Sequence, residues 1–149
     1  MQQRWFEDFA VGDEFRSPGL TLTEAAIVDF AWRYDPQPFH IDRTAAEQSP
    51  YGGLIASGWQ LGSVLFRLFL MDNPFGEASL GSPGVDELRW HLPARPGDTV
   101  RTVARVVEVR ASQSRADRGL VTVRYELRNQ KDEAVMSLKA VQLVRRRPA

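Results

Sequence analysis

The sequence predicts an α+β fold in which a curved antiparallel sheet wraps around a long buried helix. Residues 56–71 are apolar on nearly every helical face and carry one charge, that of Arg67. Residues 121–128 alternate between apolar and polar side chains, which is typical of a strand with one face in water. A helical pattern comes first along the chain and a long series of strand patterns follows, which favours one sheet packed on the single all-apolar helix.

The composition limits the classes of protein that the chain can be. Its 149 residues, 43% of them hydrophobic, are enough for one well-packed domain over residues 1–149. Lys and Arg number 19 and so do Asp and Glu, so no net positive charge draws the protein to nucleic acid or to an anionic membrane. The start is acidic rather than apolar and cysteine is absent, so we expect a cytoplasmic protein. Two histidines far apart in sequence and no cysteine also predict no metal site.

The amino-terminal part predicts a broken strand and then a helix. Residues 14–17 and 20–22 have strand character, and Pro18 and Gly19 interrupt them. Thr21 has capping-box spacing to Glu24, and Thr23 is an equally good N-cap. Apolar side chains then recur at helical spacing, and Pro36 ends the helix. The recurring side chains are Ile27, Phe30, Ala31 and Tyr34.

The most apolar segment, residues 56–71, predicts a helix that is buried on all sides. At about 1.5 Å per residue it would be roughly 24 Å long, short of a hydrocarbon core of about 30 Å. Because it also carries Arg67, we expect a core helix and not a membrane span. One further helical turn is expected at residues 44–48, with a loop at 49–53.

The second half of the chain predicts a meander of antiparallel strands. We expect these strands at residues 84–92, 99–110, 121–128 and 134–140, with a turn at 95–98. Three consecutive arginines, Arg145 to Arg147, are expected to be a frayed, solvated end.

Residues 34–42 are the strongest candidate for chemistry. Pro36 and Pro38 fix φ and remove two N–H donors, so the segment is expected to be a rigid, exposed loop that is neither helix nor central strand. Asp35 and His40 are close enough in sequence to converge, and an imidazole can act as a base near neutral pH. Taken alone, Asp35 could cap a helix or begin an Asx-turn, and His40 could be a structural hydrogen-bonding group. Gln37 could equally reach the pocket or face solvent.

Two other polar residues are predicted to be structural. Asp42 is expected to be a turn residue or the N-cap of the segment at Thr44. His91 lies within a predicted strand, followed by Leu92 and Pro93.

The segment Asp35-Pro36-Gln37-Pro38-Phe39-His40-Ile41-Asp42 resembles the Asp-x-Asn-Pro-x-His-x-Asp loop of MaoC-like dehydratases and (R)-specific enoyl-CoA hydratases. The resemblance covers most of the chain and implies their hot-dog fold. Gln37 stands where that family has Asn. Ser57-Gly58 stands where it has a His-Gly pair that opens the central helix.

The resemblance implies an acyl-CoA hydratase or dehydratase of fatty acid metabolism. Asp35 and His40 would activate a water that adds to C3 of a trans-2-enoyl thioester and would return a proton at C2. The N–H of Gly58, at a helix N-terminus, would stabilise the enolate oxygen, with Ser57 and Gln37 as further substrate-binding candidates. No cofactor is implied beyond the coenzyme A of the substrate. The family pairing of sheets implies a homodimer or a dimer of dimers.

Two other functions compete with hydration. Other hot-dog proteins hydrolyse thioesters with a carboxylate on or near the central helix, but residues 56–71 contain no Asp or Glu. A non-catalytic acyl-CoA-binding module is the second alternative, because Gln37 and Ser57 could mark a site that has lost activity.

Overall fold

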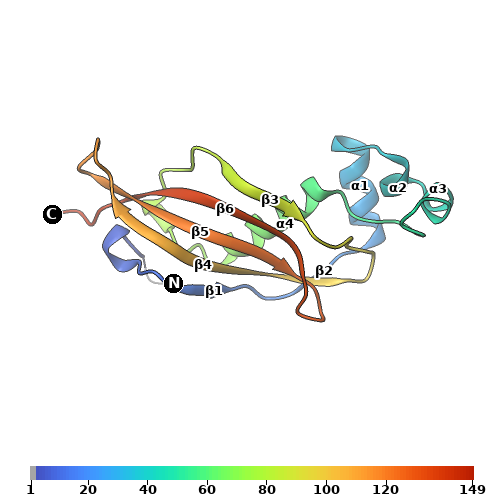
Figure 1. Ribbon diagram of the computed structural model, residues 1–149, viewed down its shortest axis with the longest axis horizontal. Coiled ribbons are helices and arrows are strands. Elements are labelled where there is room, and N and C mark those ends of the chain that lie inside the picture. The colour runs from blue at the N-terminus through green and yellow to red at the C-terminus, as the bar shows by residue number, and fades with distance from the viewer. Residues whose placement is uncertain (1–2) are drawn as a thin grey trace.

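The computed structural model describes residues 3–149 and contains a curved sheet that wraps around one long helix (Figure 1). The strands are β1 (Glu14–Arg16), β2 (Leu20–Thr21), β3 (Val85–Trp90), β4 (Thr99–Ala111), β5 (Arg118–Arg128) and β6 (Ala134–Arg145). They pair antiparallel in the order β1-β4-β5-β6-β3, and β2 also pairs with β4. This arrangement confirms the predicted α+β fold class.

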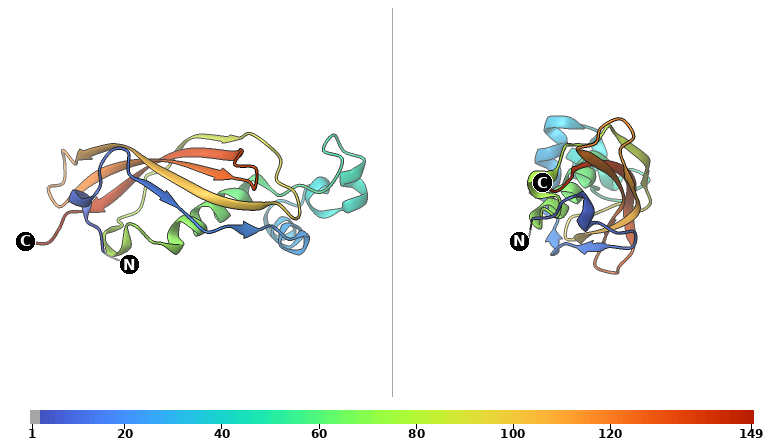
Figure 2. Two further views of the ribbon diagram at one scale, coloured as in Figure 1. Left: turned by 90° about the horizontal axis from the view of Figure 1, so that it is seen from below. Right: turned by 90° about the vertical axis from the view of Figure 1, so that its left-hand side faces the viewer.

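The helices divide into a core helix and a cluster at one end of the molecule. The α-helices are α1 (Glu24–Tyr34), α2 (Pro38–Ile41), α3 (Arg43–Glu47) and α4 (Gly58–Met71), and short 3₁₀ turns lie at Phe6–Asp8 and Gly76–Ala78. Figures 1 and 2 both place α1, α2 and α3 beyond one end of the sheet, while α4 runs along its concave side. The amino-terminal end of α4 therefore points toward the cluster of short helices.

Helix α1 begins where the sequence predicts. Thr23 is its N-cap, and the Thr23 hydroxyl accepts a hydrogen bond of 3.1 Å from the N–H of Ala26. The helix ends at Tyr34, and Asp35 is its C-cap, as expected before Pro36. Of the two N-cap candidates, Thr23 rather than Thr21 is correct, because Thr21 belongs to β2.

The expectation that residues 34–42 contain no helix is wrong. Residues Pro38–Ile41 form the short helix α2, with Pro38 in its first turn. A proline is compatible with this position, because the first N–H groups of a helix have no helical acceptor and the fixed φ already suits the helix. Gln37, in the extended conformation that precedes a proline, is its N-cap. Residues 43–47 then form α3, close to the turn predicted at 44–48.

Helix α4 ends at Met71 as predicted, but it begins at Gly58, two residues later than the predicted segment, and it is not buried on all sides. One face, with Leu61, Leu65 and Leu68, packs into the core against the sheet. The other face is open, and Trp59 and Met71 are 60% and 57% exposed. The expectation of a helix buried on all sides is therefore wrong, because a single curved sheet covers only one side of it (Figure 2).

Strand β5 follows the predicted alternation, and the hairpin of β5 and β6 extends further than predicted at its open end. Strand β3 is shorter than the predicted strand at 84–92. In β5 the side chains of Val121, Val123, Tyr125 and Leu127 are buried, while those of Arg124 and Arg128 lie on the opposite face. Strand β5 starts at Arg118 and β6 continues to Arg145, since the two pair along this whole length.

The three arginines at the end are held in place and are not a frayed terminus. Arg145 belongs to β6, and Arg146 forms an ion pair of 3.2 Å with Glu7. Arg147 forms another of 2.6 Å with Asp8. Among the described residues, no helix is both long enough and apolar enough to cross a membrane.

Candidate active site

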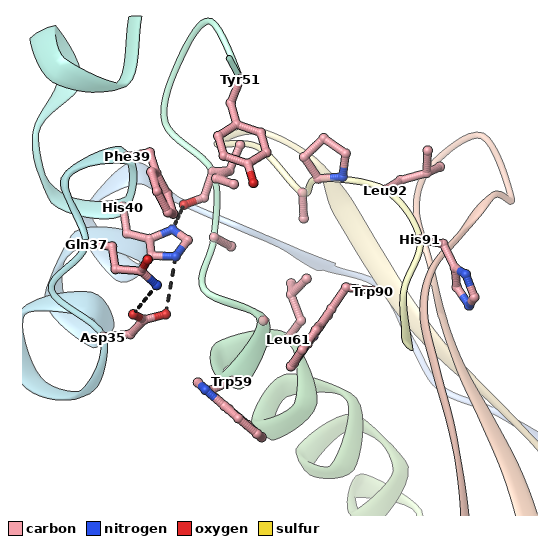
Figure 3. A pocket seen from close by; sticks show the side chains of 15 residues that line it. Asp35, Gln37, Phe39, His40, Tyr51, Trp59, Leu61, Trp90, His91 and Leu92 are labelled. Atoms are coloured by element: carbon pink, nitrogen blue, oxygen red, sulfur yellow. Dashed lines mark hydrogen bonds and ion pairs between the residues drawn. The ribbon is translucent and has the colours of Figure 1, made fainter. Parts of the chain in front are cut away.

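The amino-terminal end of α4, helix α2 and the segment after β3 enclose a cleft of about 520 Å³ (Figure 3). Asp35, Gln37, His40 and Gly58, all predicted site residues, line it. Residues from three separate stretches of the chain therefore meet in one place. The structure brings together every residue that the sequence proposed for the site. Ser57 does not line the cleft itself, but its hydroxyl bonds the Asp35 carboxylate.

Asp35 and His40 lie next to each other in the cleft. His40 Nε2 lies 3.3 Å from Asp35 Oδ2, and His40 Nδ1 lies 2.7 Å from the carbonyl oxygen of Ile55. Because a carbonyl can only accept a hydrogen bond, Nδ1 must carry a proton. In the neutral imidazole, Nε2 therefore has a free lone pair directed at the carboxylate side of the cleft. A water placed there could give a proton to Nε2.

The Asp35 carboxylate is held by donors on both oxygens. Gln37 Nε2 donates to Oδ1 over 2.7 Å, and the Ser57 hydroxyl donates to Oδ2 over 2.7 Å. Burial acts to raise the pKa of Asp35, but the hydrogen bonds from Gln37 and Ser57 and the nearby His40 outweigh it, so this pKa lies below its ordinary value. Asp35 is therefore ionised at neutral pH.

The surroundings of His40 differ from the sequence prediction. The segment was expected to be exposed, but His40 is only 4% exposed. The ring of Phe39 packs edge-on against the imidazole at a centroid distance of 4.6 Å, and Tyr51 packs on Phe39. The short helix α2 directs the His40 side chain toward the interior, and this explains its burial.

Gln37 was expected either to reach the pocket or to face solvent. In the structure its side chain lines the cleft and bonds Asp35.

Gly58 is the first residue of α4, and Ser57 is its N-cap. The Ser57 hydroxyl accepts a hydrogen bond from the N–H of Trp59. Among residues 3–149 the N–H of Gly58 has no hydrogen-bond acceptor, and it lies at the positive end of the helix dipole. This N–H is available to a negatively charged oxygen in the cleft.

The reason for glycine at position 58 differs from the one expected. A Cβ at this position would collide with the indole of Trp90, which packs directly on the Gly58 backbone. The space left by the missing side chain is therefore filled by Trp90 and is not open to a thioester. Trp90 and the carbonyl of Ile55 are the components that sequence reasoning missed. A backbone carbonyl has no sequence signal, and Trp90 is 32 positions away from Gly58 in the chain.

The two residues predicted to be structural have structural contacts. Asp42 is the N-cap of α3, and its carboxylate accepts a hydrogen bond of 3.0 Å from the N–H of Ala45. His91 Nε2 lies 2.7 Å from the Ser137 hydroxyl, and its ring points away from Asp35 (Figure 3). In the part of the chain that the structure describes, no three His, Cys, Asp or Glu side chains gather as a metal site would require.

Comparison with known proteins finds one matching family and relatives along the whole chain. The family model described as MaoC like domain matches residues 8–130. A MaoC-like dehydratase from Rhodospirillum rubrum is 39% identical, with a TM-score of 0.92 over 98% of this chain and 99% of that one. The uncharacterized protein YdeM of Bacillus subtilis is 26% identical over 140 residues, which is 94% of this chain and 98% of YdeM.

More distant structures have the same fold. The R-hydratase PhaJ1 from Pseudomonas aeruginosa has a TM-score of 0.78 at 21% identity, covering 96% of this chain and 86% of that one. Rv0216 from Mycobacterium tuberculosis, which is described as having a double hot-dog fold, has a TM-score of 0.74 at 23% identity over 98% of this chain and 45% of that one. The curved sheet around α4 is therefore a hot-dog fold, as the resemblance implied.

Proposed function

We propose, from the premise that this chain belongs to the MaoC-like domain family, that it adds water reversibly to a trans-2-enoyl-CoA and gives a 3-hydroxyacyl-CoA. The observation that carries the proposal is the 3.3 Å approach of His40 Nε2 to Asp35 Oδ2 in a cleft that also contains the free N–H of Gly58. A base, an acid and an oxyanion donor are the three groups that this reaction needs.

The chemistry follows from the positions of these groups. A water beside the pair, in contact with both Asp35 and His40, gives one proton to His40 Nε2 while its oxygen bonds to C3 of the enoyl group. The electrons of the C2–C3 double bond move toward the thioester and form an enolate, whose oxygen accepts a hydrogen bond from the N–H of Gly58. His40 then returns the proton to C2. In the opposite direction the same steps remove water from a 3-hydroxyacyl thioester.

Asp35 contributes as an anion and as a holder of water. A carboxylate has about four lone-pair positions, and Gln37 and Ser57 use one on each oxygen. The remaining positions can hold the water and stabilise the imidazolium that forms during the reaction. Because the thioester makes the C2 proton acidic, no cofactor is needed beyond the coenzyme A of the substrate.

Thioester hydrolysis is less well supported. Helix α4 contains no Asp or Glu that could act as nucleophile or base. The non-catalytic alternative rests on the replacements at Gln37 and Ser57, yet both of these side chains donate directly to the Asp35 carboxylate. They hold the Asp35 carboxylate in place instead of leaving it unsupported.

An assay with purified protein and a series of trans-2-enoyl-CoA substrates tests the proposal. Hydration removes the ultraviolet absorbance of the conjugated enoyl thioester without releasing free thiol. Release of thiol would indicate hydrolysis and would overturn the proposal. Tight binding with neither signal would indicate a binding module.

A further inference from the structure

An apolar groove of about 680 Å³ lies next to the catalytic cleft, between the open face of α4 and strands β3, β5 and β6. Gly58 and Trp59 line both hollows, so the groove begins where the catalytic cleft ends. No charged side chain lines the groove. An acyl chain attached to a thioester at Gly58 would have this groove in front of it.

Two elements give the length of the groove. Along β6 the floor of the groove runs from Met136 to Gln142. The Met136 side chain lies against α4, because its Cε is 3.6 Å from the position that a Cβ on Gly62 would occupy. Six strand residues correspond to roughly 20 Å. Along α4 the wall runs from Gly58 to Leu70, or roughly 18 Å. Gln142 therefore lies at the end of the groove that is farthest from Asp35 and His40.

A buried polar pair stands at this far end. Gln142 Nε2 donates a hydrogen bond of 3.1 Å to the hydroxyl oxygen of Tyr125, and the two residues are 6% and 1% exposed. Both line the groove. Within residues 3–149 no other hydrogen bond uses the Tyr125 hydroxyl proton or Gln142 Oε1. One donor and one acceptor are therefore left over at this end of the groove, which Asn73, Ser79 and Ser82 also line.

These two groups become costly once an acyl chain displaces water from the groove. A polar group in an apolar wall loses its water, and the loss is compensated only when all of its hydrogen bonds are made. Burial also raises the pKa of Tyr125 far above its ordinary value, so the hydroxyl keeps its proton and remains a donor. Phe in place of Tyr125 and an aliphatic residue in place of Gln142 would fill the same wall without this cost.

We propose that the groove binds the acyl chain and that Tyr125 and Gln142 recognise a neutral oxygen, a hydroxyl or a carbonyl, near the far end of that chain. The proposal rests on the proposed function, which places the thioester at Gly58. A hydroxyl would accept from Tyr125 and donate to Gln142 Oε1, which uses both free groups. A carboxylate is not expected there, because the groove offers no cation to neutralise it.

The test compares matched trans-2-enoyl-CoA substrates of increasing length. In each pair the chain ends either in a hydroxyl or in a methyl group of similar size. At one chain length, the hydroxyl substrate is expected to have a kcat/KM about tenfold higher, the size expected for one neutral hydrogen bond. A third substrate with a terminal carboxylate is expected to be the poorest at that length.

Two variants assign the preference to the polar pair. Tyr125→Phe removes one hydroxyl and keeps the ring, so the tenfold ratio of kcat/KM between the hydroxyl and methyl substrates should fall to about one. Met136→Leu changes the same groove without changing its polarity and should keep the preference. Equal rates for both members of every pair, or an undiminished preference in Tyr125→Phe, would overturn the proposal.

A binding experiment separates this proposal from the proposed function. If the wild type hydrates neither substrate, hydration is wrong, but calorimetry with the corresponding saturated CoA thioesters still measures the subsite. A tenfold tighter Kd for the hydroxyl thioester that is lost in Tyr125→Phe would support the subsite alone. Equal Kd values would reject it.

Discussion

The Ser57 hydroxyl donates a hydrogen bond of 2.7 Å to Asp35 Oδ2, so the residue that caps α4 also holds the carboxylate of the candidate site. Ser57 Oγ also accepts a hydrogen bond from the N–H of Trp59 in the first turn of the helix. Asp35 is therefore tied to the end of the helix that presents the free N–H of Gly58. This link fixes the acid–base pair relative to the proposed oxyanion donor.

Substitution of Asp35 or His40 is expected to abolish most hydration activity. Asp35→Asn keeps the shape but removes the negative charge, and His40→Ala removes the base. Each should lower kcat by on the order of 10² or more, as expected for the loss of a positioned acid–base group. His91→Ala is the matched control, because the His91 side chain bonds Ser137 and points away from Asp35. Near-normal hydration by a folded Asp35→Asn protein would contradict the assignment.

Ser57→Ala is expected to shift the pH profile. The Ser57 hydrogen bond helps to lower the pKa of Asp35, so its removal raises that pKa, and the acid limb of kcat/KM moves to higher pH. The helix also loses a cap worth about 1 kcal/mol. Ser57→Thr keeps the hydroxyl and should keep the wild-type profile. A profile for Ser57→Ala that overlays the wild type would refute this role.

The stability of the same variant should depend on pH in a defined direction. A carboxylate whose pKa is lower in the folded state stabilises the fold above its unfolded pKa, and this contribution disappears as the pH falls through the folded value. The difference in thermal stability between wild type and Ser57→Ala should therefore be largest near neutral pH and smaller in acid. A constant difference across this range would mean that only the cap is lost.

The Gly58 amide can be tested once the Trp90 indole is removed. Any side chain at position 58 collides with that ring, so the substitutions are compared in a Trp90→Ala background, which is tolerable because Trp90 is half-exposed. In that background Gly58→Pro deletes the N–H, and Gly58→Ala keeps it. The proline variant should be slower than the alanine variant by on the order of 10²–10³. Equal rates would exclude the Gly58 N–H as the oxyanion donor.

The protein is expected to form a homodimer or a dimer of dimers. Strand β3 lies at the edge of the sheet, and the open face of α4 beside it exposes large apolar side chains. Outside the proposed acyl groove, Met71 at the end of α4 and Trp90 on β3 are exposed in this way. Light scattering at micromolar concentration measures the oligomeric state directly. A monomer would contradict the prediction and show that these surfaces remain in water.

The local features of this protein could be predicted from its sequence. The N-cap Thr23, the end of α1 before Pro36 and the period-2 alternation of β5 depend on neighbouring residues alone. The spacing of Asp35 and His40 was likewise enough to place them in one site, because five residues of constrained backbone cannot carry them far apart. Their contact at 3.3 Å agrees with that expectation.

Only the tertiary structure decided the features that depend on packing between distant segments. The filling of the Gly58 position by Trp90, the open face of α4 and the pairing of Tyr125 with Gln142 each join residues that no local pattern connects. The burial of His40 belongs to the same group, because it requires Ile55 and Phe39 to close around the ring. A sequence pattern records which side chains avoid water. The curvature of the sheet and the side of α4 that it covers decide which of those side chains meet.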